Sequence, residues 1–330
     1  MKCAVLALAA SSFASLAQAG TIDAIEAFGD SLSDAGNAFI ATGGTVPGSP
    51  YSAGRFSNGN VWVQDLALEL GLGPLTPSLA GGTDYAVGSA QSGTTLFNVA
   101  GQADLPNQIA QFQIANSGVA DPNALYTIWI GANDLDAIPA GATPSQITTD
   151  VGAIVGNIDD AIGTLAALGA RNFLVLTVPD LGQTPDALAL PPGGALALSE
   201  LSAGFDNALV NGSGPLPSLA GLAAADGIDI STLNTYGLLD SIIADPAAAG
   251  LTDVTDPCLT GEIDYSGGTP CANPNQYLFW DGEHPTAAGH ALVADAAFQV
   301  VTPEPASLLL SGIGLCGLFL LRRRYCGGNR

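Results

Sequence analysis

Positively charged side chains are scarce in this 330-residue sequence, which has seven Lys and Arg residues against 30 Asp and Glu. Between Gly20 and Thr302 only Arg55 and Arg171 are basic, against 29 acidic residues, so this span carries a formal charge of −27. Such a body repels nucleic acid and anionic membrane surfaces. We therefore expect no nucleic acid partner and interpret the charge as a solubility feature.

Histidine and cysteine are also rare. The only histidines are His284 and His290, and no Cys-x-x-Cys pair is present, so we expect no zinc site and assign no metal ligands; calcium binding by surface carboxylates stays open. Three of the five cysteines lie near the chain ends. The other two, Cys258 and Cys271, are 13 positions apart in a stretch rich in Asp, Gly and Pro, and an oxidising compartment favours a disulfide between them over metal binding.

Two common motifs are missing or misplaced. No Gly-x-Ser-x-Gly elbow occurs, so the α/β-hydrolase version of serine chemistry is not indicated. Gly312, Gly314 and Gly317 match the dinucleotide-binding spacing, but they lie in an apolar tail and no acidic residue follows about 20 positions later. We expect no organic cofactor.

The first 19 residues have the pattern of a secretory signal peptide. A short basic start, Met1-Lys2, is followed by an apolar stretch from Cys3 to Ala17 and by small residues up to Ala19. The mature protein is therefore expected to begin near Gly20. Residues 20–301 are enough for one large domain, and no long linker interrupts them.

Residues 302–330 form a third unit. Pro303-Glu304-Pro305 precedes an apolar segment, Ala306–Leu321, which ends at three arginines. This segment is slightly short for a membrane helix, which needs roughly 17–25 residues, but the arginines suit a cytoplasmic flank. The arrangement resembles the PEP-CTERM sorting signal of Gram-negative bacteria, although Thr302 stands where Val is frequent.

The resemblance to a sorting signal implies processing by an exosortase-type protease near the Pro-Glu-Pro. We expect an exported protein at the cell envelope, on the cell surface or outside the cell. The segment 306–321 would anchor it transiently in the inner membrane.

Apolar runs of strand length alternate with helix-like segments in the middle of the chain. The expected strands are 22–28, 125–130 and 173–178, and the expected helices include 61–70, 105–115 and 147–168. This alternation predicts a parallel α/β sheet, and continuous apolar strands indicate helices on both faces. Residues 185–194 are interpreted as a loop.

Each expected strand ends in residues that can carry chemistry. Asp30-Ser31 follows the first strand, Asn133-Asp134 the second and Asp180 the third. Ligands of open α/β sheets bind beyond the carboxyl ends of the strands, so these residues are expected to converge on one crevice.

A hydroxyl nucleophile needs a base, and the two histidines differ as candidates. Asp281 lies three residues before His284, where it can orient the imidazole and stabilise its protonated form. His290 has no such acidic neighbour and lies in an amphipathic stretch, Thr286–Ala297, where an ordinary packed or surface histidine is expected.

Four sequence blocks, in family order, make the chain resemble the SGNH hydrolases, also called GDSL esterases/lipases, and within them the lecithinase or haemolysin-like branch. The blocks are Gly29-Asp30-Ser31-Leu32 continuing to Asn37, Tyr85-Ala86-Val87-Gly88, Gly131-Ala132-Asn133-Asp134 and Asp281-Gly282-Glu283-His284-Pro285-Thr286. The stretch Arg55–Gly59 is also frequent in that branch.

The resemblance implies a three-layer α/β/α fold with a parallel, flavodoxin-like sheet. It further implies that Ser31 is the nucleophile, His284 the general base and then acid, and Asp281 the residue that fixes the histidine. The oxyanion hole would consist of the N–H groups of Ser31 and Gly88 and the side-chain amide of Asn133. Uncharged donors of this kind suit a developing oxyanion.

Other residues in these blocks have structural interpretations. Asp34 and Asn37 are expected to cap the helix after the first strand, and Trp280 to pack beside the site. Asp134 stays without a role. Arg55 is either a surface charge or a guide for a substrate carboxylate or phosphate.

The sequence therefore predicts a hydrolase that cleaves carboxylic esters without a cofactor. Lipase, phospholipase and short-chain esterase activities remain open. The alternatives are O-deacetylation of an extracellular polysaccharide, or a catalytically silent surface-binding module. No substrate-binding residue is identified from the sequence.

Overall fold

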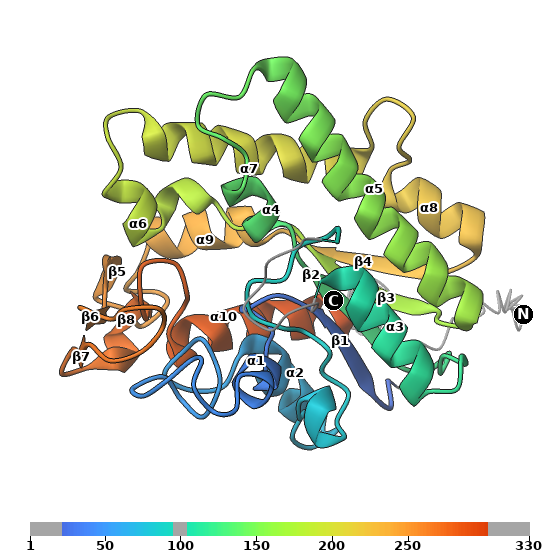
Figure 1. The fold of residues 1–330 in the computed structure, drawn as a ribbon, viewed down its shortest axis with the longest axis horizontal. Coiled ribbons are helices and arrows are strands. Elements are labelled where there is room, and N and C mark those ends of the chain that lie inside the picture. Colours follow the sequence, from blue (N-terminus) through green and yellow to red (C-terminus); the bar gives the residue numbers. More distant parts are fainter. Residues whose placement is uncertain (1–21, 95–103, 303–330) are drawn as a thin grey trace, which may run out of the picture.

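Four parallel strands form the sheet at the centre of the molecule (Figure 1). The computed structural model describes residues 22–94 and 104–302, so the predicted signal peptide, and the predicted sorting tail after Thr302, lie outside the described residues. The strands follow one another across the sheet, and each pairs in parallel with the next. They are β1 (Ile25–Gly29), β2 (Leu125–Trp129), β3 (Asn172–Leu176) and β4 (Asp229–Leu233).

A fifth, irregular segment pairs with the outer edge of β1. The N–H of Ala27 donates to the Thr83 carbonyl over 3.0 Å, and the N–H of Tyr85 donates to the Ala27 carbonyl over 2.7 Å. The pairing is parallel. Because this segment lies between β1 and β2 in the chain but outside β1 in the sheet, the order is that of a flavodoxin-like sheet. The predicted fold class is confirmed.

Helices surround the sheet and occupy most of the connections. The α-helices are α1 (Asn37–Ala41), α2 (Trp62–Glu69), α3 (Leu105–Ala115), α4 (Ala132–Asp136), α5 (Pro144–Leu168), α6 (Pro185–Leu188), α7 (Gly194–Asn211), α8 (Leu219–Asp226), α9 (Thr235–Ala244) and α10 (Ala287–Val301). Short 3₁₀ turns are η1 (Ser78–Ala80), η2 (Leu181–Gln183) and η3 (Pro274–Gln276).

The two faces of the sheet bury different helices because side chains alternate along each strand. Tyr126 and Ile128 of β2 pack in one cluster with residues of α3, α5, α7 and α8. Leu125 and Trp129 point to the other face and pack with α2 and α10. Figure 1 shows α5 and α7 on one side of the strands and α2 and α10 on the other. Three layers result.

The stretch expected to be a loop, residues 185–194, is partly helical. Thr184 accepts a hydrogen bond from the N–H of Ala187 over 3.3 Å, and Pro185 occupies the first turn of α6. Proline fits there because its missing N–H has no partner in a first helical turn. The prediction of a loop was wrong for this four-residue helix, which lines the groove described below.

Small strands build a lobe before α10. These are β5 (Asp253–Pro257), paired with β8 (Tyr277–Phe279), and β6 (Leu259–Thr260), paired with β7 (Thr269–Pro270). The predicted disulfide between Cys258 and Cys271 is confirmed and joins the two halves of this lobe. Cys258 packs with Tyr51 and Trp280, which ties the lobe to the loop after α1.

Candidate active site

Ser31 lies in a tight turn at the carboxyl end of β1. A Cβ at Gly29 would collide with the carbonyl oxygen of Trp129, so only glycine fits where the strand ends. The Asp30 carboxylate then accepts the N–H of Leu32 over 3.0 Å, and the Asp30 carbonyl accepts the N–H of Ser33. Asp30 therefore organises the turn that presents Ser31.

His284 reaches Ser31 from a second turn, between β8 and α10. The carbonyl of His284 accepts the N–H of Trp280 over 2.7 Å, which closes the turn. The Asp281 carboxylate accepts the N–H groups of Glu283 and His284 over 3.0 and 2.7 Å. Thr286 then caps α10 by accepting the N–H of Gly289. These bonds fix the direction of the imidazole.

The structure brings the predicted triad together. Nε2 of His284 is 2.8 Å from Oγ of Ser31, and Nδ1 of His284 is 2.8 Å from Oδ2 of Asp281. All three side chains are buried. A hydroxyl bonded to an imidazole that is itself held by a carboxylate is the arrangement of an activated nucleophile.

The charges of this group are coupled. Burial alone would lower the pKa of His284, but the carboxylates of Asp281 and Glu283 outweigh it and raise the pKa to about 9. Burial likewise opposes ionisation of Asp281, yet the imidazole and two backbone N–H groups hold the pKa of Asp281 below its usual value. Asp281 therefore remains the anion that a protonated imidazole needs.

Three residues near the imidazole were not predicted from the sequence. Tyr51 donates its hydroxyl to Oδ2 of Asp281 over 2.7 Å. The rings of Phe56 and Tyr265 pack against the His284 ring with centroids 5.3 and 5.6 Å apart. Only Phe56 belongs to a stretch that the sequence singled out, and nothing in the local pattern around Tyr51 or Tyr265 indicates a contact this distant along the chain.

Glu283 is a fourth missed neighbour. One carboxylate oxygen lies 3.8 Å from Nε2 of His284 and accepts the hydroxyl of Tyr265 over 2.9 Å. Its position within the Asp281–Thr286 block was noted, but its role was not. It places a negative charge near the edge of the imidazole that contacts Ser31.

The predicted oxyanion-hole donors differ in whether they already make a hydrogen bond within the protein. The N–H of Ser31 has no hydrogen-bond partner within residues 22–94 and 104–302. The N–H of Gly88 donates to the Asp34 carboxylate over 2.9 Å and is therefore engaged. A Cβ at Gly88 would collide with the ring of Phe56, so the glycine is explained by packing.

The residue after Gly88 offers another donor. Ser89 has a φ of 63°, which turns the chain in the left-handed region, and its N–H has no partner in the described part of the chain. Asn133, in the first turn of α4, uses its side-chain amide to donate to the Ala90 carbonyl over 3.0 Å. Its carboxamide is thus held by the same short segment.

Two expected capping residues have structural roles. The carboxylate of Asp34 accepts the N–H groups of Gly36 and Ala38 over 2.7 and 3.0 Å, at the start of α1. Asn37 instead donates to the carbonyls of Asp84 and Ala86, which joins α1 to the segment that edges the sheet. The capping prediction is confirmed for Asp34 alone.

The remaining candidates are structural too. Arg55 donates to the side chain of Gln64 over 2.7 Å and is half-buried. His290 is fully buried, and burial lowers its pKa to about 3, so it is the packed histidine that was expected. Trp280 stacks edge-on against Tyr51, as predicted. Asp134 accepts the N–H and hydroxyl of Ser92.

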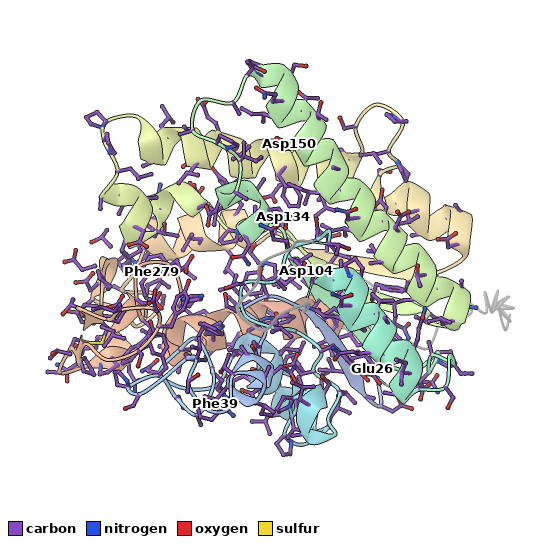
Figure 2. The ribbon with its side chains drawn as sticks, viewed as in Figure 1. Glu26, Phe39, Asp104, Asp134, Asp150 and Phe279 are labelled. Carbon is purple, nitrogen blue, oxygen red and sulfur yellow. A yellow bond between two sulfur atoms is a disulfide. The ribbon has the colours of Figure 1, made fainter. Side chains whose placement is uncertain are left out.

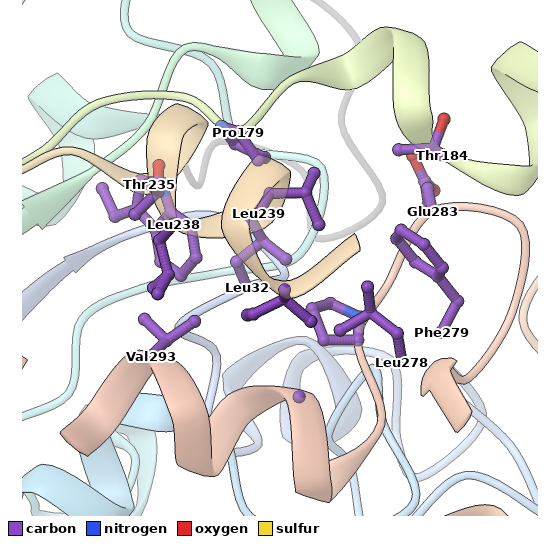
Figure 3. Close-up of a pocket in the computed structure, with 14 residues that line it drawn as sticks. Leu32, Pro179, Thr184, Thr235, Leu238, Leu239, Leu278, Phe279, Glu283 and Val293 are labelled. Atoms are coloured by element: carbon purple, nitrogen blue, oxygen red, sulfur yellow. The ribbon is translucent and has the colours of Figure 1, made fainter. Parts of the chain in front are cut away.

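A small apolar cavity of about 50 Å³ lies beside the triad, lined by residues that include Leu32, Phe279 and Glu283. Figure 3 shows it between α9, β8 and α10.

Figure 2 places Asp134 on α4, well away from Glu26 of β1. Among residues 22–94 and 104–302, no group of three His, Cys, Asp or Glu side chains is arranged to hold a metal ion.

Comparison with known families gives two matches. The model of the GDSL-like lipase/acylhydrolase family matches residues 25–297. The model of the PEP-CTERM protein-sorting motif matches residues 301–324, so the predicted sorting motif is confirmed.

Several characterised proteins are similar in sequence. A GDSL esterase/lipase of Arabidopsis thaliana is 29% identical over 309 residues, covering 83% of this chain and 88% of the plant protein. The phosphatidylcholine-sterol acyltransferase of Aeromonas hydrophila is 29% identical, covering 86% and 80%. The thermolabile hemolysin of Vibrio parahaemolyticus is 26% identical, and the match covers 86% of this chain and 64% of the hemolysin.

Among solved structures, an acetylxylan esterase from Geobacillus stearothermophilus aligns with 86% of this chain and 97% of its own. The TM-score is 0.43 and the sequence identity 14%.

Proposed function

The chain belongs to the GDSL-like lipase/acylhydrolase family of ester hydrolases, and from that membership we propose that it is an exported serine esterase that acts through an acyl-enzyme on Ser31. The observation that carries this proposal is the 2.8 Å contact between Ser31 Oγ and His284 Nε2, with Asp281 behind the imidazole. No other pair of hydroxyl and imidazole in the described residues has this support from a carboxylate.

In the first half-reaction, Ser31 Oγ bonds to the acyl carbon while its proton passes to His284 Nε2. The tetrahedral intermediate then expels the alcohol oxygen, which takes that proton, and the acyl group stays on Ser31. In the second half-reaction, water gives a proton to His284 and attacks the acyl carbon. The acid leaves, and Ser31 recovers its proton from His284.

Asp281 stabilises the imidazolium that forms in both half-reactions. We assign Tyr51 to the support of Asp281, because its hydroxyl donates to the oxygen that also faces His284. The negative charge of the intermediate would be met by the Ser31 N–H and the Asn133 amide. Gly88 can serve only after Asp34 releases its N–H, whereas the Ser89 N–H has no partner among the described residues.

Export is the second part of the proposal. The PEP-CTERM motif implies an exported protein whose C-terminal segment is processed by an exosortase. We propose residues 1–19 as the signal peptide, 20–301 as the hydrolase domain and 302–330 as the sorting segment. On this account the apolar segment 306–321 holds the protein in the inner membrane only until processing.

The test is active-site labelling with a fluorophosphonate, followed by mass-spectrometric location of the modified residue. We expect the label on Ser31 and loss of p-nitrophenyl ester hydrolysis in Ser31→Ala. Ser145→Ala, at an exposed helical serine, is the matched control and is expected to keep the label on Ser31 and the hydrolysis of p-nitrophenyl esters. A label elsewhere, or full turnover in Ser31→Ala, would overturn the proposal, and a silent binding module would give no label.

A panel of p-nitrophenyl esters, phosphatidylcholine and acetylated glycans separates the substrate classes. Release of acetate from glycans alone would favour the polysaccharide O-deacetylase. Hydrolysis of lipid or aliphatic esters would favour the esterase or lipase.

A further inference from the structure

A large groove lies beside the proposed active site. It has a volume of about 690 Å³ and is bounded by α4 with the loop after it, by α6 and by α7. Only four of its lining residues have polar side chains, namely Asp136, Thr184, Asp186 and Glu283. The others are Ala, Leu, Ile, Pro or Gly. Its volume is within the usual range for small-molecule sites.

Residues next to the reacting centre line the groove. Glu283 lines it and also lies 3.8 Å from His284 Nε2, the atom that contacts Ser31. Leu135 and Asp136 also line it, from α4, whose first turn carries Asn133. An ester carbonyl held between Ser31 and Asn133 would therefore have the groove next to it.

The polar lining gathers at the end next to His284. The N–H of Asp186 donates to the Gly282 carbonyl over 3.0 Å, which places α6 against the histidine turn. Partial desolvation and then the charges of Glu283 and Asp186 raise the pKa of Asp136 to about 6. The end of the groove next to the ester carbonyl is therefore polar and acidic, and the rest of the groove is apolar.

This polarity matches a fatty acyl chain better than a sugar. No aromatic and no amide side chain lines the groove, and the Thr184 hydroxyl already donates to the Leu181 carbonyl over 2.9 Å. Among the described residues a glycan would therefore find neither a stacking surface nor a free neutral side-chain donor along the groove. An alkyl chain needs only apolar contact. Leu190, between α6 and α7, and Leu196 of α7 are also exposed, at 45% and 63% of their surface.

The smaller cavity in Figure 3 shares Thr184 and Glu283 with the groove but has only about 50 Å³. It has no room for more than a short group. The groove is therefore the place for a chain of several carbon atoms.

We propose that this groove binds the acyl chain of the substrate, so that the enzyme prefers esters of medium- or long-chain fatty acids. The inference rests on the proposed function and adds to it the substrate class and the site that selects it.

The first test is a series of p-nitrophenyl esters from acetate to dodecanoate, each below its aggregation concentration. Burying one methylene group is worth about fourfold in kcat/KM. We expect kcat/KM to rise in steps of this order until the groove is filled. A flat profile, or a maximum at acetate, would overturn the inference.

The second test fills the groove from two walls. Ala197 on α7 and Ala140 in the loop after α4 both line it and are exposed, so Ala197→Trp and Ala140→Trp should fold. We expect each to lower kcat/KM for the octanoate at least tenfold relative to the acetate. Ala203→Trp, an exposed alanine of α7 outside the groove, is the matched control and should keep the wild-type ratio.

Thermal denaturation of each variant checks the fold. If both groove variants fold and keep the wild-type chain-length ratio, the assignment of the groove is wrong. The proposed function fails differently, because then no ester, acetate included, would be hydrolysed in a Ser31-dependent way.

Discussion

The hydroxyl of Tyr51 and the carboxylate of Asp281 meet at 2.7 Å although 230 residues separate them in the chain. The same oxygen, Oδ2, also lies 2.8 Å from Nδ1 of His284. Burial and then the charge of Asp281 raise the pKa of the Tyr51 hydroxyl, so it stays a neutral donor. Tyr51 therefore offsets part of the negative charge that His284 experiences.

Removing this hydroxyl should change the pH dependence of the reaction. In Tyr51→Phe, Asp281 keeps its charge but loses one donor, so the pKa of His284 should rise and the acid limb of kcat/KM should move to higher pH. A hydrogen bond to a charged group contributes about 1.5–3 kcal/mol, and we expect kcat/KM at neutral pH to fall about tenfold. The measurement is a pH profile of p-nitrophenyl ester hydrolysis.

Tyr126→Phe is the matched control. It removes a hydroxyl that donates to the Asp121 carbonyl, outside the site. Its pH profile should keep the wild-type limb even if its stability falls. If the acid limb of kcat/KM in Tyr51→Phe stays at the wild-type pH, the tyrosine contributes packing only.

Asn133→Ala tests the oxyanion assignment. Losing one oxyanion donor costs about 2.7–4 kcal/mol of transition-state stabilisation, or a factor of about 10²–10³ in kcat. The variant should keep its fold, because the Asn133 side chain is half-buried and makes one hydrogen bond, to the Ala90 carbonyl. Asn123→Ala, at an exposed asparagine, is expected to keep full activity. Wild-type kcat/KM in Asn133→Ala would contradict the assignment.

The raised pKa of His284 predicts an alkaline enzyme. The imidazole must be unprotonated to accept the proton of Ser31, so activity should fall as the pH falls below its pKa of about 9. Asp281→Asn removes the main charge that raises this pKa, so its weaker activity should show an acid limb at lower pH. Both limbs can be measured with one buffer series. A wild-type limb near pH 6.5 would show that the two carboxylates do not act as the distances indicate.

The disulfide should stabilise both the lobe and the site. Closing a loop of this length contributes about 3 kcal/mol through the unfolded state. We expect the double variant Cys258→Ala/Cys271→Ala to lose roughly 6–12 °C in Tm. Because Cys258 packs with Tyr51 and Trp280, kcat/KM should fall as well. A drop in Tm without any change in kcat/KM would show that the lobe does not hold Tyr51 in place.

The sequence was sufficient for the contact between Ser31 and His284, because both residues lie in recognisable blocks at ends of secondary-structure elements. It was also sufficient for the strands with continuous apolar runs. It did not predict β4, where Asp229, Ser231 and Thr232 are exposed or half-buried, because an edge strand lacks the full apolar pattern. The segment paired to β1 was missed because it is too short and irregular to show a period.

Features of the site that the sequence did not predict have the same cause. A sequence shows which residues can donate, but not which N–H groups are already engaged, so the resemblance implied Gly88 although Asp34 accepts its N–H. Tyr51 and the apolar groove depend on contacts between distant segments. The residues involved are leucines, alanines and a single tyrosine. These are common residue types, and they carry no local signal in the sequence.

Glu26 gives a prediction about stability that is independent of the active site. It lies in β1 with 7% of its surface exposed, and its Oε2 has no hydrogen-bond partner within residues 22–94 and 104–302. Burial and then the charge of Asp121 raise its pKa to about 8. Because the folded pKa exceeds that of the unfolded chain, the neutral carboxyl favours folding below about pH 4.5, and this contribution is lost as the pH rises through 8.

Glu26→Gln should therefore change stability little at pH 5 and increase it at pH 8, by on the order of 2 kcal/mol, since no charge then has to be buried. Urea denaturation at both pH values measures the effect. Glu200→Gln, at an exposed glutamate of α7, is the control and should show no such dependence on pH. A gain of equal size at both pH values would mean that Glu26 ionises alike in the folded and unfolded chains, so that burial in the sheet does not raise its pKa.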